Sequence, residues 1–138
     1  MIEYRGGCHC GNLRLAYRSA VAPEATLVRA CQCSFCRKHG VRTVANPEGS
    51  AEIAIADPLR LLRYRFGLGI ADYLVCLGCG VYLAAVQDER RAVLVLNALE
   101  DAARFTQPAR PMDYDGETAA ERRARRARLW TPVELSGA

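Results

Sequence analysis

The stretch "CQCSFCRKHG", residues 31–40, places three cysteines within six positions. Cys31 and Cys33 are separated by one residue, which is too close for a comfortable disulfide, and a third thiol would still lack a partner. The chain has seven cysteines, so a complete disulfide framework would leave one thiol over. Cysteines clustered in this way in a reducing compartment are usually metal ligands or redox centres. We therefore interpret the cysteines as metal ligands and ask how the seven are divided.

Four of the cysteines form two short pairs, Cys8 with Cys10 and Cys76 with Cys79, and glycines flank both pairs. Each pair can present two sulfurs to one zinc ion at about 2.3 Å. We expect this four-thiolate site to be structural, because it ties the start of the domain to its later strands. In a domain of this size, such a site contributes on the order of 10 kcal/mol or more to folding.

The triplet Cys31, Cys33 and Cys36 offers three thiolates to a second zinc ion. A zinc ion with three protein ligands keeps one position for water or substrate, which is typical of catalytic sites. Alternatively, His39, His9 or a carboxylate completes the shell and the second site is structural. The spacing also permits a different division of the ligands, or a shared two-metal cluster.

The composition is that of an ordinary globular protein with one domain. The 138 residues are 51% hydrophobic and 25% charged, and no apolar run approaches the roughly 18 residues of a membrane span. The first residues, "MIEYRGGCHCG", do not resemble a signal peptide, so we expect a cytoplasmic protein without a membrane segment. The formal charge of +4 would fall to about +1 with seven thiolates on two zinc ions, which weakens charge as a reason to expect nucleic-acid binding.

Hydrophobic periodicity predicts a mainly β fold. Alternating or continuous apolar runs favour strands over residues 13–17, 26–33, 51–56, 59–66, 71–76, 81–86 and 91–99. Ser34 is expected to cap one short helical turn that stops at Gly40. We expect these elements to form a zinc-binding β domain over residues 1–112.

A helix is predicted near the C-terminus, over residues 116–130. The segment is rich in Ala, Glu and Arg, and Thr118 with Glu121 fits a capping box. We expect residues 113–138 to form a helical tail packed on the same domain. The five arginines of this helix are balanced by five acidic residues of the tail, so we expect a solvated face, packed through its alanines, Leu129 and Trp130, and not a nucleic-acid interface.

Three segments, in this order, resemble the glutathione-dependent formaldehyde-activating enzyme family, which includes centromere protein V. They are "GGCHCGNLR" (residues 6–14), "CQCSFCRKHG" and "CLGCG" (residues 76–80), and the likeness extends over residues 4–97. The resemblance implies coiled antiparallel sheets around zinc, in the Mss-four-like class, with the two cysteine pairs as structural ligands and the triplet as ligands of the catalytic zinc. Members of the family often carry an aromatic residue directly before the third motif, and here that position is Val75.

The same resemblance implies an activity. Members join formaldehyde to glutathione to give S-hydroxymethylglutathione, formally a carbon–sulfur lyase reaction run in reverse. The two carboxylates of glutathione call for cations near the metal, and Arg37 and Lys38 are the nearest in sequence. The alternative is a zinc-stapled binding module without catalysis, because thiols add to formaldehyde readily on their own. The thiol, the aldehyde and the oligomeric state stay open.

Overall fold

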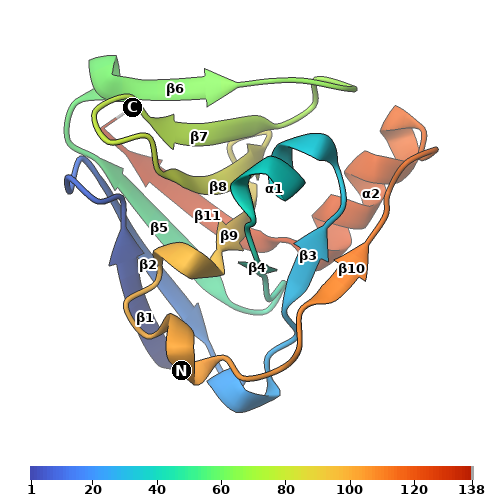
Figure 1. Ribbon diagram of the computed structural model, residues 1–138, viewed down its shortest axis with the longest axis horizontal. Helices are drawn as coiled ribbons and strands as arrows, with labels where there is room; N and C mark the ends of the chain where they lie inside the picture. The colour runs from blue at the N-terminus through green and yellow to red at the C-terminus, as the bar shows by residue number, and fades with distance from the viewer. Residues whose placement is uncertain (138) are drawn as a thin grey trace.

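The computed structural model describes residues 1–137 and shows a mainly β protein built on one sheet of eleven strands (Figure 1). The strands are β1 (Ile2–Gly7), β2 (Leu13–Ser19), β3 (Arg29–Cys31), β4 (Thr43–Val44), β5 (Ser50–Ile55), β6 (Leu61–Tyr64), β7 (Asp72–Cys76), β8 (Tyr82–Gln87), β9 (Arg91–Val95), β10 (Arg110–Met112) and β11 (Thr131–Ser136). Two α-helices, α1 (Ser34–His39) and α2 (Ala119–Leu129), and four short 3-10 turns, η1 (Pro23–Ala25), η2 (Pro58–Arg60), η3 (Leu96–Ala98) and η4 (Ala102–Arg104), complete the fold. None of the helices in the described part is long and apolar enough to cross a membrane.

The sheet has two antiparallel sections that share one core. In the first section β1, β2 and β5 pair in that order, and in the second β6, β7, β8 and β9 form a meander. β11 joins the two sections, parallel to β5 and antiparallel to β9 (Figure 1). The core cluster draws on both, with Leu13 and Ile53 from the first and Leu74 and Leu94 from the second, all fully buried. Because apolar side chains of both sections are buried in one core, the twisted sheet curls around its own apolar face.

Most of the predicted strands are present, and their buried faces follow the predicted alternation. In β2, Leu13, Leu15 and Tyr17 are buried while the residues between them are exposed or half-buried. Three predicted runs are shorter than expected. The run over residues 26–33 keeps only β3, and the run over residues 91–99 ends at Val95, where η3 follows. The run over residues 59–66 begins in η2, because Pro58 opens a turn that the side chain of Asp57 caps.

The tail differs from the expected helical tail over residues 113–138. Its helix α2 carries the predicted capping box, but residues 131–136 form β11 and lie inside the sheet. β10 also runs through Pro111, which the structure tolerates because β10 is the edge strand of its branch. β10 is parallel to β3, and β11 is parallel to β5, so the sheet is mixed and not purely antiparallel.

The packing of α2 also corrects the prediction that the helix rests on its alanines. Its four alanines are all exposed, whereas Arg122 and Arg125 are half-buried and Arg126 is buried. The guanidinium carbon of Arg126 lies 4.5 Å from the centre of the Trp130 ring, and that of Arg125 lies 3.5 Å from the Tyr114 ring. A guanidinium stacks well on an aromatic face, so arginines can line the inner side of this helix.

Candidate metal centres and adjoining cavities

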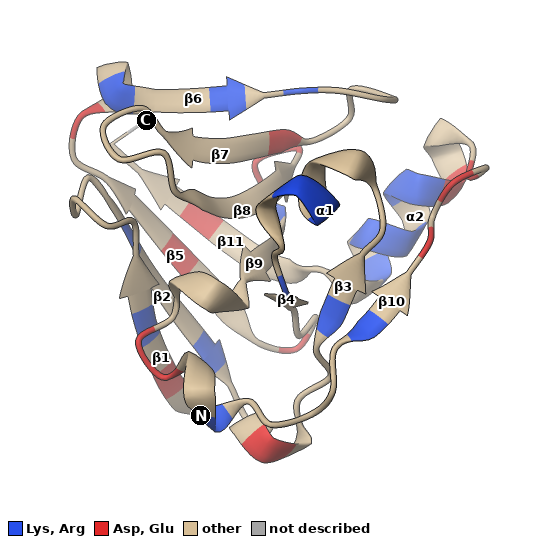
Figure 2. Cartoon of the chain, in the orientation of Figure 1, with Lys and Arg blue, Asp and Glu red and all other residues tan. Residues whose placement is uncertain are grey.

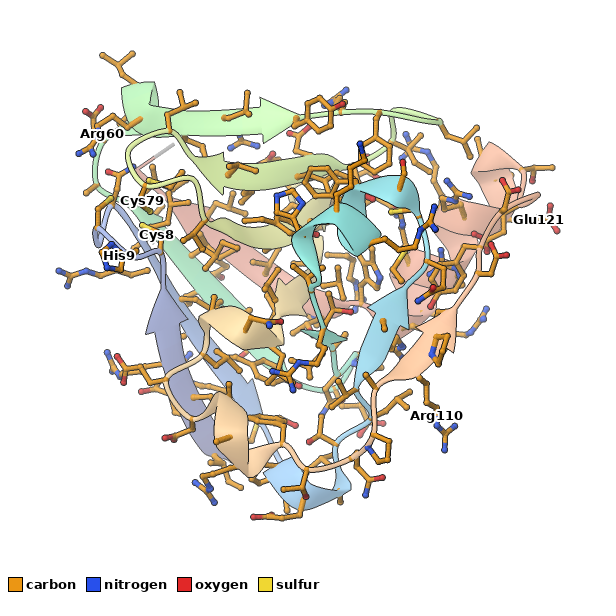
Figure 3. The ribbon with its side chains drawn as sticks, viewed as in Figure 1. Cys8, His9, Arg60, Cys79, Arg110 and Glu121 are labelled. Carbon is orange, nitrogen blue, oxygen red and sulfur yellow. The ribbon has the colours of Figure 1, made fainter. Side chains whose placement is uncertain are left out.

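The first cysteine cluster lies where the turn after β1 meets the turn between β7 and β8. The sulfurs of Cys8, Cys10, Cys76 and Cys79 all lie within 4.8 Å of one another. Cys10 Sγ is 3.8 Å from Cys8 Sγ and 3.5 Å from Cys76 Sγ. Four sulfurs placed tetrahedrally at the zinc–sulfur distance would be about 3.8 Å apart, so the cluster has the size of a four-thiolate metal site. Figure 3 shows Cys8 and Cys79 together at one edge of the molecule, beside Arg60.

Backbone N–H groups point at these sulfurs. Leu13 N donates to Cys8 Sγ at 3.2 Å, and Gly78 N donates to Cys76 Sγ at 3.3 Å. The N–H of Asn12 lowers the pKa of Cys10, with further help from the Cys76 thiol. Such donors stabilise the thiolate form that metal binding requires. The turn also depends on Gly80, whose φ of +83° is strained for other residues.

The second cluster is made by β3 and the start of α1. The sulfurs of Cys31, Cys33 and Cys36 lie within 4.8 Å of one another. Cys33 is the N-cap of α1, with φ −63° and ψ 155°, and its Sγ accepts a hydrogen bond from Cys36 N at 3.4 Å. The sequence suggested Ser34 as the cap, but Ser34 is the first residue of the helix. The cap therefore turns Cys33 toward Cys36, and Gly40 ends the helix with φ +61°, as predicted.

The three thiols of this cluster share charge unequally. Hydrogen bonds from Cys31 and then Cys36 lower the pKa of Cys33 to about 2. Hydrogen bonds with Cys31 and then Cys33, together with burial, raise the pKa of the Cys36 thiol far above its usual range. The negative charge of the cluster thus lies mainly on the sulfur of Cys33, and the thiols of Cys31 and Cys36 are hydrogen-bonded to it. This is a suitable starting point for binding a cation.

No histidine or carboxylate within residues 1–137 joins the triplet as a fourth ligand. His39, the alternative nearest in sequence, has Nδ1 3.0 Å from the carbonyl oxygen of Phe35. Its ring packs at 4.4 Å from the Phe35 ring and 5.6 Å from the Tyr82 ring, centre to centre. The geometry therefore makes His39 part of an aromatic wall, and the triplet stands as a three-sulfur set.

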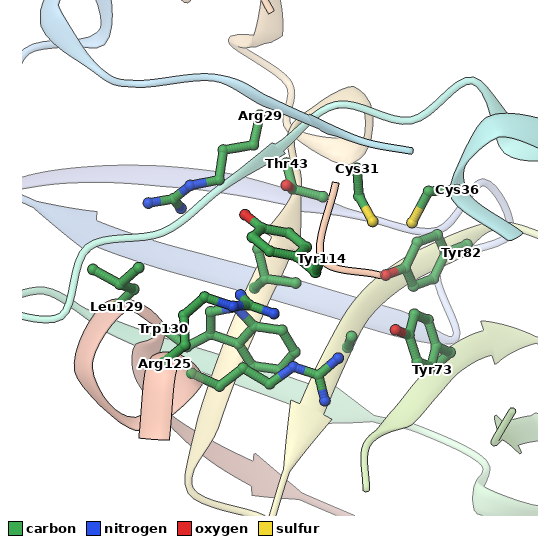
Figure 4. Close-up of a pocket in the computed structure, with 13 residues that line it drawn as sticks. Arg29, Cys31, Cys36, Thr43, Tyr73, Tyr82, Tyr114, Arg125, Leu129 and Trp130 are labelled. Carbon is green, nitrogen blue, oxygen red and sulfur yellow. The ribbon is translucent and has the colours of Figure 1, made fainter. Parts of the chain in front are cut away.

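Two adjoining cavities meet at the triplet. The inner chamber, about 50 Å³, is lined by Cys31 and Cys36 among others (Figure 4). The outer groove, about 410 Å³, is lined by Cys31 and Cys33. Both cavities also share parts of their walls, namely Tyr73, Tyr114, Arg125 and Arg126. The sulfur triplet thus lies at the junction of a small enclosed space and a larger open one.

Tyrosines form the side of the inner chamber that faces the triplet. In Figure 4 the hydroxyls of Tyr73 and Tyr82 point toward the space below the sulfurs of Cys31 and Cys36. Burial raises the pKa of Tyr73 to about 12 and that of Tyr82 well above its usual range. Both phenols therefore stay protonated near neutral pH and can donate hydrogen bonds into the chamber.

The cations at the cavity walls are not the ones expected from the sequence. Arg37 and Lys38 are exposed on α1 and line neither cavity, whereas Arg125 and Arg126 of α2 line both. Figure 2 shows these two groups of basic residues on α1 and along α2. The composition of the helix predicted that these arginines face solvent. The spacing of these residues could have predicted that they pack against the domain. Residues of one helix face recur every three or four positions, as do Arg122, Arg125, Arg126 and Leu129.

No family model matches the chain. Among solved structures, the fold is similar to that of a protein from Rhodobacter sphaeroides, known from a crystal structure, with a TM-score of 0.60 and 24% sequence identity. The likeness covers 78% of this chain and 99% of the Rhodobacter protein. The two proteins therefore share a fold.

Proposed function

We propose that this protein is a two-zinc enzyme of the Mss-four-like class that adds a small thiol, such as glutathione, to a small aldehyde, such as formaldehyde. This is carbon–sulfur lyase chemistry in the direction of synthesis. The observation that carries the proposal is the triplet, three sulfurs within 4.8 Å of one another at a wall shared by two cavities. The resemblance of the cysteine motifs to formaldehyde-activating enzymes points to the same chemistry.

In this proposal Cys8, Cys10, Cys76 and Cys79 hold the structural zinc, and Cys31, Cys33 and Cys36 hold the catalytic one. All-sulfur ligand sets of this size suit zinc better than magnesium or calcium, which prefer oxygen ligands. Zinc bound by the triplet would supply a position at which a thiol loses its proton more easily. All seven cysteines are free thiols, which suits the reducing cytoplasm.

The two cavities suggest how this chain would arrange the reactants. The outer groove of about 410 Å³ has the size of a small-molecule site and offers Arg122 and Arg125 to the carboxylates of a peptide-like thiol. The inner chamber has room for the aldehyde only. Addition forms the carbon–sulfur bond, opens the carbonyl π bond and leaves the thiol proton on the new hydroxyl. The phenols of Tyr73 and Tyr82 would donate hydrogen bonds to that oxygen as it gains charge.

Calorimetry on the zinc-loaded protein tests the proposal, with glutathione compared with S-methylglutathione. Loss of the thiol should weaken binding by about tenfold or more, since a thioether is a poor zinc ligand. Cys36→Ser should abolish the difference between the two ligands. Equal affinities in the unaltered protein would instead support a zinc-stapled binding module whose triplet holds no substrate.

A further inference from the structure

Arg126 is a buried cation without an acidic partner. Three other arginines of α2 are paired, Arg122 and Arg125 with Glu117, and Arg123 with Asp88, while Arg128 is exposed to solvent. Arg126 is only 6% exposed, and within residues 1–137 it makes no ion pair. Its Nε is fully buried and has no hydrogen-bond partner. A guanidinium keeps its charge even where burial lowers its pKa, as it does here.

Apart from a contact with the hydroxyl of Tyr73, the packing of Arg126 leaves its donors, Nε among them, free for a ligand. The flat face of the guanidinium lies on Trp130, 4.5 Å from the ring centre. A guanidinium donates its hydrogen bonds in its own plane, so the stack does not occupy them. A buried and unpaired charge is strongly unfavourable unless something compensates it. Since Arg126 also lines the inner chamber, the compensating group can enter through the chamber.

The metal centre alone does not balance the charge. Zinc with three thiolates carries one net negative charge, and two unpaired guanidiniums, Arg29 and Arg126, line the inner chamber. Arg125 shares the single carboxylate of Glu117 with Arg122 and so adds no negative charge to this balance. No aspartate or glutamate is found in the described wall of the chamber. At least one positive charge is therefore left over, and a neutral molecule such as formaldehyde would not use it.

We propose that the inner chamber binds the carboxylate of a small 2-oxo acid of about the size of glyoxylate, so that the carbonyl substrate is an anion. The inference rests on the proposed function and names its second substrate. A chamber of 50 Å³ holds only a few water-sized groups, which limits the acid to two or three carbons. The thiol sulfur bonds to the carbonyl carbon, the carbonyl π bond opens, and the thiol proton ends on the new hydroxyl, with no oxidation or reduction.

The probes for this test are glycolate and glycolamide, which have nearly the same shape but differ in charge, and neither reacts with thiols. Trp130 is the only tryptophan of the chain and stacks on Arg126, so its fluorescence reports on the chamber directly. In the zinc-loaded protein, glycolate should change this fluorescence in a saturable way and bind about tenfold or more tightly than glycolamide. Equal binding of the two probes would overturn the proposal.

Two variants test whether Arg126 causes the preference for glycolate. Arg126→Gln should remove the preference for glycolate, whereas Arg128→Gln, an exposed arginine of the same helix, should keep it. A glycolate preference that survives in a folded Arg126→Gln protein would contradict the assignment. If Arg126→Gln fails to fold, the comparison of the two probes in the unaltered protein still decides the matter.

Product formation separates this inference from the proposed function. Proton NMR of glutathione with glyoxylate or formaldehyde, with and without the zinc-loaded protein, measures adduct formation for each aldehyde. We expect faster adduct formation with glyoxylate. If the protein accelerates formation of the formaldehyde adduct but does not bind glycolate, the proposal of a 2-oxo acid substrate is wrong and the proposed function still stands. Glycolate binding without acceleration of either reaction would overturn both the proposed function and the substrate role of the acid.

Discussion

The Sγ atom of Cys10 lies 3.5 Å from the Sγ atom of Cys76, although 66 residues separate them in the chain. Cys10 follows β1, in the first section of the sheet, and Cys76 ends β7, in the second. Within the sheet, β11 is the strand that pairs with both sections. A metal ion held by these sulfurs would therefore cross-link the two halves of the core.

Cys76→Ser should unfold or strongly destabilise the protein, because it opens this cross-link at a fully buried position. Cys36→Ser, the matched change in the triplet, should lower the melting temperature much less, since the triplet joins only β3 to the adjoining α1. Thermal unfolding followed by circular dichroism compares the two. If both variants melt alike, the triplet is as structural as the four-cysteine site.

The freshly purified protein should contain two zinc ions per chain. The four-cysteine site should hold its ion more tightly, because it has one more thiolate. During graded chelation, alkylation followed by mass spectrometry should therefore label Cys31, Cys33 and Cys36 before the other four cysteines. Elemental analysis that finds one ion, with the triplet reactive from the start, would show that the triplet does not retain metal.

The sequence predicted the parts of the fold that depend on local pattern. The alternation in β2 and β5 follows from burial of one face of each strand, and the spacing within the cysteine motifs predicted both clusters. β11 was missed because its place depends on β5 and β9, which are distant in sequence, and Pro132 weakens its local signal. Long-range pairing of this kind has no local signature.

For a related reason, the cysteine triplet of the candidate site could be predicted from the sequence, but the part of the cavity wall that α2 supplies could not. The three cysteines are close in sequence, so their contact follows from a cap and a helical turn. The cavity wall is supplied by α2, about ninety residues later, and its arginines look like solvent-facing residues by composition. The aromatic rings of Tyr114 and Trp130, on which Arg125 and Arg126 stack, offset part of the cost of burying them, and no local pattern predicts that stacking.

Gly6→Ala should destabilise the protein more than Gly78→Ala. A Cβ at Gly6 would lie 2.2 Å from the carbonyl oxygen of Ala98, a backbone atom that cannot move away without disturbing the sheet. A Cβ at Gly78 would meet the tip of the Arg60 side chain, which can rotate aside. We expect a loss of about 1–3 kcal/mol for Gly6→Ala and less for Gly78→Ala. Chemical denaturation of the two variants gives the comparison, and equal losses would contradict it.

Asp72 should make the protein more stable at neutral than at acid pH. Burial opposes ionisation of this carboxyl, but hydrogen bonds from Arg65 and Arg63 outweigh it and hold its pKa below the usual value. A carboxyl with a lowered pKa in the folded protein stabilises it above the unfolded pKa, near 4. That contribution is lost as the pH falls through the folded value.

Asp72→Asn should therefore cost about 1–2 kcal/mol at pH 7, because two arginines lose a mostly buried partner. The difference between the variant and the unaltered protein should shrink as the pH falls below 4. Urea unfolding at several pH values measures it. A difference that stays constant over this range would show that the carboxylate charge contributes nothing.

Glu117→Gln should tighten the binding of glutathione while it weakens the fold. The Glu117 carboxylate accepts hydrogen bonds from Arg125 Nε at 2.8 Å and from Arg122 Nε at 3.1 Å, and both arginines line the outer groove. The hydrogen bond from Arg125, opposed by burial, lowers the pKa of Glu117, so the carboxylate stabilises the folded protein at neutral pH. An amide at this position removes the competing negative charge, so both guanidiniums become available to the carboxylates of glutathione.

We expect a gain in glutathione affinity of about two- to fivefold at pH 7, the range of a partly exposed charge contact. Calorimetry measures it, and Glu121→Gln is the control, because Glu121 is an exposed carboxylate in the first turn of α2 that lines neither cavity. The gain should shrink at high salt, since it is electrostatic. A loss of affinity in Glu117→Gln would mean that the carboxylate is needed to hold Arg122 and Arg125 in place. The position of the two arginines would then matter more for glutathione binding than their free charge.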